Sequence, residues 1–400
     1  MQSKRIAYLA ATPFFLPIAV AILFIGLGDA VSGSYLTLFA VDKAHLSPLA
    51  LGIFLTVLAL SGITISMVFG RWFDRAPTTV PVFIALLMTA VGYALLTITT
   101  QYYLLLLIAC VPLGTSAAAF PQLFALAKAH LDKVEEETAG RGAAMMRAAW
   151  SVAWAVGPVL GALAITLFEF TGVFLTTTLC AVAAMLIVAI ARVSAPERKI
   201  RTDARVTPQR RMIPTTLLAA SSLTLFHTAM FMGSIALPIV VTHNLGGTKA
   251  EVGLIFSVCA FLEVVVMSAF VLRPCSPTDR RWLSAGFVAF VAYFLVITWA
   301  PSVAIVLGAQ LLRAIGIGLI GCQGISYIQA LMPNRVGSAA TLFSNTTNAG
   351  FLFAGLAAGG WGQMFGYSSM FVACAALSGL GLLMLHFQSK ITPAGEHVLG

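Results

Sequence analysis

Four charged side chains lie inside strongly apolar segments of the sequence: Asp29, Arg147, Glu263 and Arg313. A charge that faces hydrocarbon at the centre of a helix costs about 2.5–3.5 kcal/mol or more, so each should face a partner charge or a wet cavity. A carboxylate in an apolar surround can also take up and release a proton. We therefore assign these four residues to proton coupling or gating, with fixed structural ion pairs between helices as the alternative.

The depth of these charges along their segments suggests how they pair. Counting about 1.5 Å per helical residue from the expected cytoplasmic ends places Arg147 shallowest, then Glu263, Asp29 and Arg313. This order predicts one pair between Arg147 and Glu263 and another between Asp29 and Arg313. For Arg313 a direct contact with substrate is a further alternative.

A second set of candidate residues is uncharged and could bind a hydroxyl-rich ligand. Trp150 and Trp154 follow Arg147 at helical spacing, so they share one face, where an indole could stack on a sugar ring. Amide and phenol groups in other apolar segments supply donors and acceptors. The predicted substrate-binding residues are Gln122, Trp150, Trp154, Gln323, Tyr327, Gln329, Asn345 and Asn348. The alternative is hydrogen bonding between helices, worth about 0.6 kcal/mol per bond. His227, beside Thr224 and Thr228, is expected to be a hydrogen-bonded packing residue rather than a proton relay.

The composition shows what kind of element must position these residues. The chain has 400 residues, of which 60% are hydrophobic and only 9% charged, and its mean hydropathy is +0.97. A soluble domain averages about 25% charged residues, so we expect an all-α integral membrane protein surrounded by the lipid bilayer. No GxSxG, HExxH or P-loop lysine motif occurs, which indicates a protein that is not an enzyme and is not driven by ATP. No cofactor, metal or nucleic-acid partner is expected, and we expect a monomer.

Apolar segments separated by short polar turns predict twelve transmembrane helices of about 20 residues each. The expected spans are near 14–40, 48–70, 79–98, 103–127, 142–167, 173–191, 213–241, 250–272, 282–299, 303–331, 337–363 and 367–387. A single long polar stretch then divides the chain into an N-terminal half, residues 1–192, a cytoplasmic linker, 193–211, and a C-terminal half, 212–400. Lys and Arg gather in the segments of one side, which places both termini in the cytoplasm.

The two halves repeat each other weakly. Gly52 in the second span aligns with Gly253 in the eighth, within similar apolar segments. The fifth and eleventh spans also align, with Gly157 on Gly355, Gly161 on Gly359, Arg147 on Asn345 and Trp150 on Asn348. Two pseudo-symmetric six-helix halves with a site between them are typical of secondary transporters.

Several short motifs resemble a known family. The segment GRWFDR, residues 70–75, resembles the loop between spans two and three of the major facilitator superfamily, although Ala76 and Pro77 stand where that family has glycine and basic residues. More specific segments are similar to bacterial sugar efflux transporters of that superfamily. These are PQLFALAK at 121–128, MRAAWSVAWAVGP at 146–158, LE at 262–263, YIQALMP at 327–333 and GSAATLFSNT at 337–346.

The resemblance implies a multi-pass protein of the bacterial inner membrane that exports sugars or glycosides in exchange for protons by alternating access. It also implies that Asp74 and Arg75 form a conformational latch. The same resemblance places Arg147, Trp154, Glu263, Gln329 and Asn345 at the family's patterned polar positions. Two alternatives remain: an exporter of drugs or other amphiphiles from the same superfamily, and a membrane sensor that signals through the linker.

Overall fold

The computed structural model describes residues 14–131, 136–194, 214–272, 279–332 and 335–391, and all regular structure in these residues is helical. Nine helical segments among them are long and apolar enough to cross a membrane, and the shorter apolar helix Val80–Leu96 adds to these. The predicted all-α membrane fold is thus confirmed. The exact number of twelve crossings stays a prediction.

Helices cover every predicted span, and three spans include a π-helical turn. The residues before the linker form α2 (Phe15–Gly33), α3 (Leu36–Leu38), η1 (Phe39–Lys43), α4 (Pro48–Arg75), α5 (Val80–Leu96), α6 (Tyr102–Ile108), η2 (Ala109–Leu113), α7 (Gly114–Ser116), α8 (Ala119–Leu131) and α9 (Glu136–Ile190). The residues after it form α10 (Pro214–Ile239), η3 (Val240–Asn244), α11 (Lys249–Leu272), α12 (Arg280–Thr298), α13 (Val303–Leu331), α14 (Val336–Phe365) and α15 (Met370–Ile391). Predicted spans five and six both lie in α9, which breaks at Phe168 and Glu169, where φ is +54°.

The chain divides into two compact units. The first comprises residues 1–46, 54–204 and 249–257, and the second comprises 47–53, 205–248 and 258–400. The beginnings of α4 and α11 therefore belong to the opposite unit from the rest of each helix. The predicted linker, 193–211, lies almost wholly outside the described residues, so the boundaries of the halves stay predictions.

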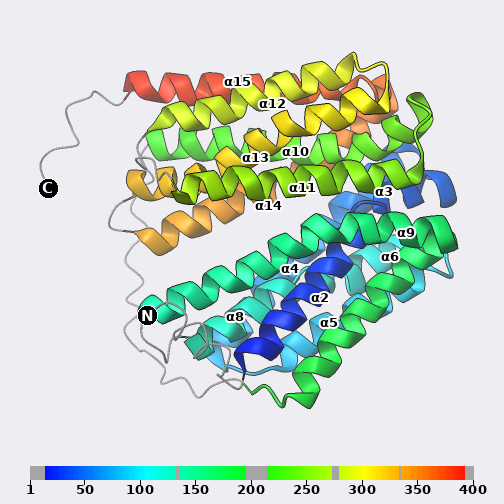
Figure 1. The fold of residues 1–400 in the computed structure, drawn as a ribbon, viewed down its shortest axis with the longest axis vertical. Coiled ribbons are helices and arrows are strands. Elements are labelled where there is room, and N and C mark those ends of the chain that lie inside the picture. Colours follow the sequence, from blue (N-terminus) through cyan, green and yellow to red (C-terminus); the bar gives the residue numbers. More distant parts are fainter. Residues whose placement is uncertain (1–13, 132–135, 195–213, 273–278, 333–334, 392–400) are drawn as a thin grey trace, which may run out of the picture. The chain divides into compact units, whose positions relative to one another are not determined.

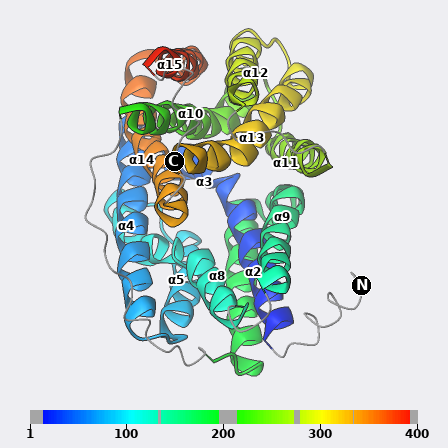
Figure 2. The same cartoon turned by 90° about the vertical axis from the view of Figure 1, so that its left-hand side faces the viewer.

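In the first unit α2 packs along α9, and small residues allow this close approach (Figures 1 and 2). A Cβ atom on Gly157 would lie 2.5 Å from Cβ of Ala30, and one on Gly161 would lie 2.8 Å from Cε2 of Tyr35. These glycines therefore admit a neighbouring helix at close distance. Because lipid offers no hydrophobic drive between helices, such close backbone contact is a main source of their association.

In the second unit α10 packs against α14 and α15, while α12 packs against α13 and α15 (Figure 1). The centre of this unit is aromatic, since Phe226, Phe287, Phe290, Tyr293 and Phe294 are all buried. The rings of Phe226 and Phe290 lie 4.4 Å apart, and those of Phe290 and Phe294 lie 4.8 Å apart with their planes at 72°. The Phe226 ring of α10 also meets the Phe287 ring of α12 edge-on, with centroids 5.4 Å apart and planes at 78°, so aromatic contacts join α10 to α12.

The aligned glycines of the internal repeat make equivalent contacts. In the second unit a Cβ on Gly52 would lie 2.8 Å from the carbonyl oxygen of Gly355, and it would also collide with Gly359. In the first unit a Cβ on Gly253 would lie 2.8 Å from Cβ of Ala162. Each of these aligned glycines thus lets its helix approach a neighbouring helix closely.

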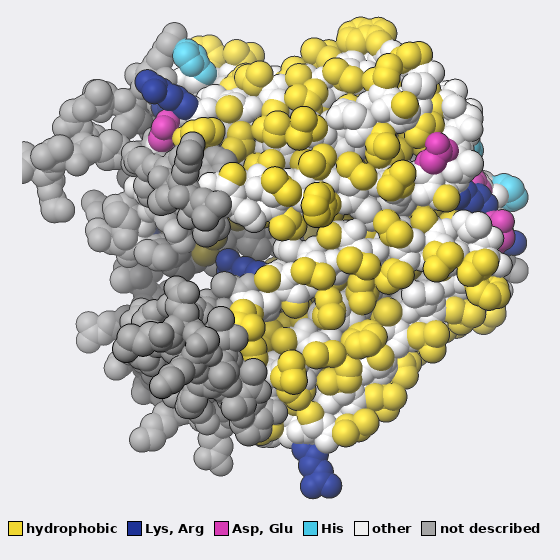
Figure 3. Space-filling view, in the orientation of Figure 1, with side chains coloured by type: hydrophobic (Ala, Val, Ile, Leu, Met, Phe, Trp, Pro, Cys, Tyr) yellow, Lys and Arg dark blue, Asp and Glu magenta, His cyan; other side chains and the backbone are white. Residues whose placement is uncertain are grey.

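The described surface is apolar over wide areas. Figure 3 shows hydrophobic side chains spread over the drawn face, with few Lys, Arg, Asp or Glu side chains among the coloured residues. Large exposed hydrophobic residues recur on many helices, among them Leu60, Leu163, Phe261 and Leu383. A surface of this composition matches contact with lipid rather than with water.

Candidate functional site

In the first unit the structure places Asp29, which is predicted to act in proton coupling or gating, beside Trp154, which is predicted to bind substrate. Asp29 is an exposed residue of α2, and the side chain of Trp154 from α9 lies close to its carboxylate. The indole lies along α2, since its Cη2 atom would be 3.6 Å from a Cβ on Gly33. Tyr93 of α5 is buried. It interacts electrostatically with Asp29 and hydrogen-bonds Ser32. The result is an accessible carboxylate beside an indole ring.

Trp150 has a different environment, although it lies one helical turn away. Its ring centroid is 4.3 Å from that of Phe120 in α8, and its Cε3 atom would be 3.1 Å from a Cβ on Gly26. Trp150 also packs against the buried core of the first unit. Its described contacts are therefore those of a packing residue between α2 and α8.

Gln122 is the most unusual of the neutral candidates. Its side chain is 2% exposed, and its Oε1 atom meets no hydrogen-bond donor among the described residues. A buried carbonyl without a partner costs about 1–3 kcal/mol, so it suits a position that accepts a bond from a ligand hydroxyl. Arg147 also faces α8, because its guanidinium carbon lies 5.7 Å from the centre of the Phe124 ring, and the residue is exposed.

In the second unit Arg313 lies within a polar cluster. It is 6% exposed, and its Nη2 atom donates to the Oγ atom of Ser234 in α10 at 2.8 Å. The guanidinium carbon lies 6.0 Å from the centre of the Tyr293 ring. Glu263 of α11 interacts electrostatically with Arg313 and accepts a hydrogen bond from Sγ of Cys259 at 3.2 Å. The structure therefore gives Glu263 and Arg313 each a neighbour of opposite charge.

This neighbourhood differs from the pairing that the depth order suggests. The predicted pairs, Arg147 with Glu263 and Asp29 with Arg313, each join residues of different units and stay predictions. The structure instead brings Glu263 and Arg313 together within one unit. The depth order could not show this because it gives the height of a residue along its helix but not the direction of its side chain.

The remaining substrate-binding candidates of the second unit fall into two groups. Asn345 and Asn348 are exposed on α14, together with Thr341 and Ser344. Tyr327 is buried, and its hydroxyl donates to Oε1 of Gln388 in α15 at 3.0 Å, so it forms the hydrogen bond between helices that was the alternative interpretation. Gln323 is buried and Gln329 is half-buried.

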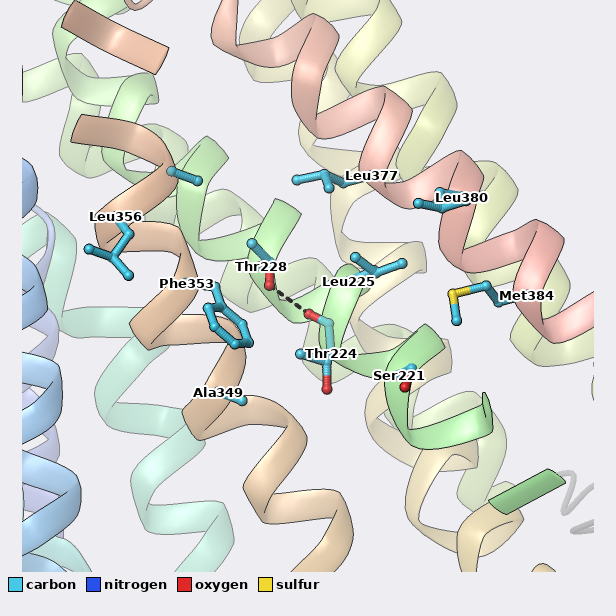
Figure 4. A pocket seen from close by; sticks show the side chains of 11 residues that line it. Ser221, Thr224, Leu225, Thr228, Ala349, Phe353, Leu356, Leu377, Leu380 and Met384 are labelled. Carbon is cyan, nitrogen blue, oxygen red and sulfur yellow. Dashed lines mark hydrogen bonds between the residues drawn. The ribbon is translucent and has the colours of Figure 1, made fainter. Parts of the chain in front are cut away.

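The second unit also contains an open groove of about 900 Å³ between α10, α14 and α15 (Figure 4). None of the predicted substrate-binding residues lines it. Its walls are mainly apolar, and the hydroxyl of Thr228 donates to the carbonyl oxygen of Thr224 at 2.8 Å. The lining residues are Ser221, Thr224, Leu225, Thr228, Ala349, Phe353, Leu356, Ala357, Leu377, Leu380 and Met384.

The predicted latch residues, Asp74 and Arg75, are exposed in the last turn of α4. Arg75 lines a small pocket of about 390 Å³ with Val68, Arg71 and Trp72. Their role in a conformational change stays a prediction.

Tyr93 and Ser234 contact the polar groups described above, yet neither is among the site residues predicted from the sequence. Ser234 falls seven residues after His227, on the same face of α10, and this spacing of polar residues was an available signal. Tyr93 had no such signal, because one tyrosine in an apolar helix is common.

Comparison with known proteins supports the same family. The sequence profile of the Major Facilitator Superfamily matches residues 18–225 and 219–397. The chain is 35% identical over 371 residues to a "Putative sugar efflux transporter" of Deinococcus radiodurans, covering 92% of this chain and 95% of the relative. It is 31% identical over 366 residues to "Sugar efflux transporter A" of Dickeya chrysanthemi, covering 90% and 92%. The crystal structure of the nucleoside transporter NupG has the same fold, with a TM-score of 0.73 at 12% identity over 93% of this chain and 99% of that one.

Proposed function

The chain belongs to the Major Facilitator Superfamily, and from this premise we propose that it exports sugars or glycosides from the cytoplasm. The names of the similar proteins from Deinococcus radiodurans and Dickeya chrysanthemi support this substrate class. The chain is a multi-pass membrane protein, and we place it in a bacterial inner membrane with both termini cytoplasmic. The gathering of Lys and Arg on one side supports that orientation.

The observation that carries the proposal is the contact between Asp29 and Trp154. A carboxylate accepts two hydrogen bonds from neighbouring sugar hydroxyls, and bonds to a charged group contribute about 1.5–3 kcal/mol each. The indole offers a flat apolar surface for the C–H face of the ring. A sugar has both hydroxyl groups for the carboxylate and a C–H face for the indole, whereas a mainly apolar amphiphile would gain little from Asp29.

Proton antiport is the energy source that we propose. Protonation of Glu263 would remove its charge and weaken its attraction to Arg313, which itself is hydrogen-bonded to Ser234 of α10. Because the free energies of the two access states differ by only a few kcal/mol, such a change can shift their populations. Alternating access between two halves then moves the sugar across the bilayer.

Counterflow of a labelled glycoside in proteoliposomes tests the substrate site. Trp154→Leu and Asp29→Asn should each raise the KM for the glycoside at least tenfold, and Trp154→Phe less, since a phenyl ring keeps part of the stacking surface. Trp299→Phe is the matched control, because Trp299 is 72% exposed at the end of α12. Equal transport by Trp154→Leu and by the control would refute the site.

The apolar groove of about 900 Å³ favours one alternative, export of an amphiphile. Competition separates the two functions. A sugar exporter loses counterflow of a labelled thioglycoside when unlabelled simple sugars are added, whereas an amphiphile exporter keeps it.

A further inference from the structure

His227 is a buried residue of α10 that none of the roles above uses. It is 6% exposed and lies where α10 contacts α14. Its ring forms an edge contact with Phe343 of α14, with centroids 5.8 Å apart and planes at 77°. Gly350, about two turns further along α14, lets the two helices approach closely, because a Cβ there would lie 2.9 Å from both the carbonyl carbon of His227 and the amide nitrogen of Thr228.

Both ring nitrogens of His227 contact hydroxyls of α14. Nδ1 lies 3.2 Å from Oγ1 of Thr346, and Nε2 lies 3.4 Å from Oγ1 of Thr347. The Thr346 hydroxyl donates its proton to the carbonyl oxygen of Phe343 at 2.7 Å, so towards the ring it can only accept. We therefore assign the proton to Nδ1, and Nε2 then accepts from Thr347.

This pair of contacts fixes the rotation of α14 about its axis. Thr346 and Thr347 are adjacent, so they lie about 100° apart around the helix, and one imidazole between them resists turning in either direction. Apolar contacts between helices resist such a rotation only weakly, because lipid can cover an apolar helix face as well as a neighbouring helix can. The buried side of α14 carries Thr346 and Gly350, and its exposed side carries Asn345 and Asn348.

We infer that His227 is a positioning residue that aims Asn345 and Asn348 of α14 at the sugar, an assignment that rests on the proposed function. It touches no ligand itself. A rotation of α14 by one residue would turn Asn348 through about 100° and withdraw its amide from the exposed face. The groove view shows the same two helices side by side, with Ala349 and Phe353 of α14 opposite Thr224 and Thr228 of α10 (Figure 4).

Three variants test this in proteoliposomes that carry a labelled glycoside. His227→Phe keeps the ring shape without its hydrogen bonds, and the double variant Thr346→Val, Thr347→Val keeps the methyl-bearing shape without the hydroxyls. Both should raise the KM by about three- to tenfold, as the loss of one or two interhelical bonds implies, with a smaller change in Vmax. Thr298→Val is the control, since in the described contacts its hydroxyl bonds the Phe294 carbonyl of its own helix, α12, at 2.8 Å, and it should leave KM unchanged.

A second readout does not depend on sugar. In a protein whose six cysteines are replaced by serine, Asn348→Cys should react with a water-soluble maleimide, and His227→Phe should slow that reaction at least threefold. An unchanged labelling rate, or an unchanged KM in both the His227 and the double threonine variants, overturns the inference. Slower labelling in a protein that transports no sugar would keep the positioning role and refute the proposed function instead.

Discussion

Neutralising Arg313 alone should destabilise the second unit more than neutralising both Arg313 and Glu263. In Arg313→Gln the Glu263 carboxylate loses its cationic neighbour, and the hydrogen bond it keeps among the described residues is the weak one from Sγ of Cys259 at 3.2 Å. Breaking a fully buried charge pair from one side costs about 3–5 kcal/mol, and the cost here is smaller because Glu263 is half-buried. The loss of the 2.8 Å bond from Arg313 to Ser234 is part of that cost, since bonds to charged groups contribute about 1.5–3 kcal/mol.

The double variant Arg313→Gln, Glu263→Gln removes the stranded charge. It should recover the stability lost to the stranded charge, leaving about 1.5–3 kcal/mol for the Ser234 bond. Thermal unfolding of the purified protein in detergent measures this as three melting temperatures, with the Arg313 single variant lowest. A double variant no more stable than Arg313→Gln, or a single variant as stable as the wild type, would refute the coupling between Arg313 and Glu263.

Three further predictions concern other contacts. Gly52→Val should lower the melting temperature and transport, because its Cβ would collide with the backbone of Gly359 and overpacking costs about 1–3 kcal/mol; unchanged unfolding and counterflow would contradict the close approach. Gln122→Leu should stabilise the protein by about 1 kcal/mol in thermal unfolding yet weaken glycoside transport, since it removes an unmet carbonyl; a destabilised variant would show a hidden partner. Lys249→Gln should cost under about 1 kcal/mol, because its 2.7 Å ion pair with Glu169 is exposed, and a larger fall in the melting temperature would show that the pair is coupled to other contacts.

The fold was largely predictable because long apolar segments separated by charged turns leave few alternatives in a bilayer. The expected fifth and sixth spans appear on the two sides of the kink at Phe168 and Glu169. The glycine contacts were also predictable, since Gly52 and Gly253 align in the repeat and make equivalent contacts. How closely two helix backbones can approach depends on the size of the side chain between them, and the sequence gives that size directly.

The neighbours of each polar residue were less predictable. Trp150 and Trp154 share one helix face, yet Trp150 packs on Phe120 and Trp154 lies close to Asp29, because that face meets two different helices. Tyr327 is bound to Gln388 for the same kind of reason. Helical spacing gives the direction of a side chain from its own axis, but the neighbouring helix decides what it meets. The expectation that His227 is a hydrogen-bonded packing residue agrees with its contacts to Thr346 and Thr347.

The most direct test of sugar export is movement of a panel of labelled sugars and glycosides by the purified wild-type protein in proteoliposomes, with and without an imposed proton gradient. The proposed function predicts saturable counterflow of at least one of them, and movement against its concentration gradient when protons flow the opposite way. The proposed function would be contradicted if no sugar or glycoside in the panel showed counterflow in vesicles that do transport an amphiphile.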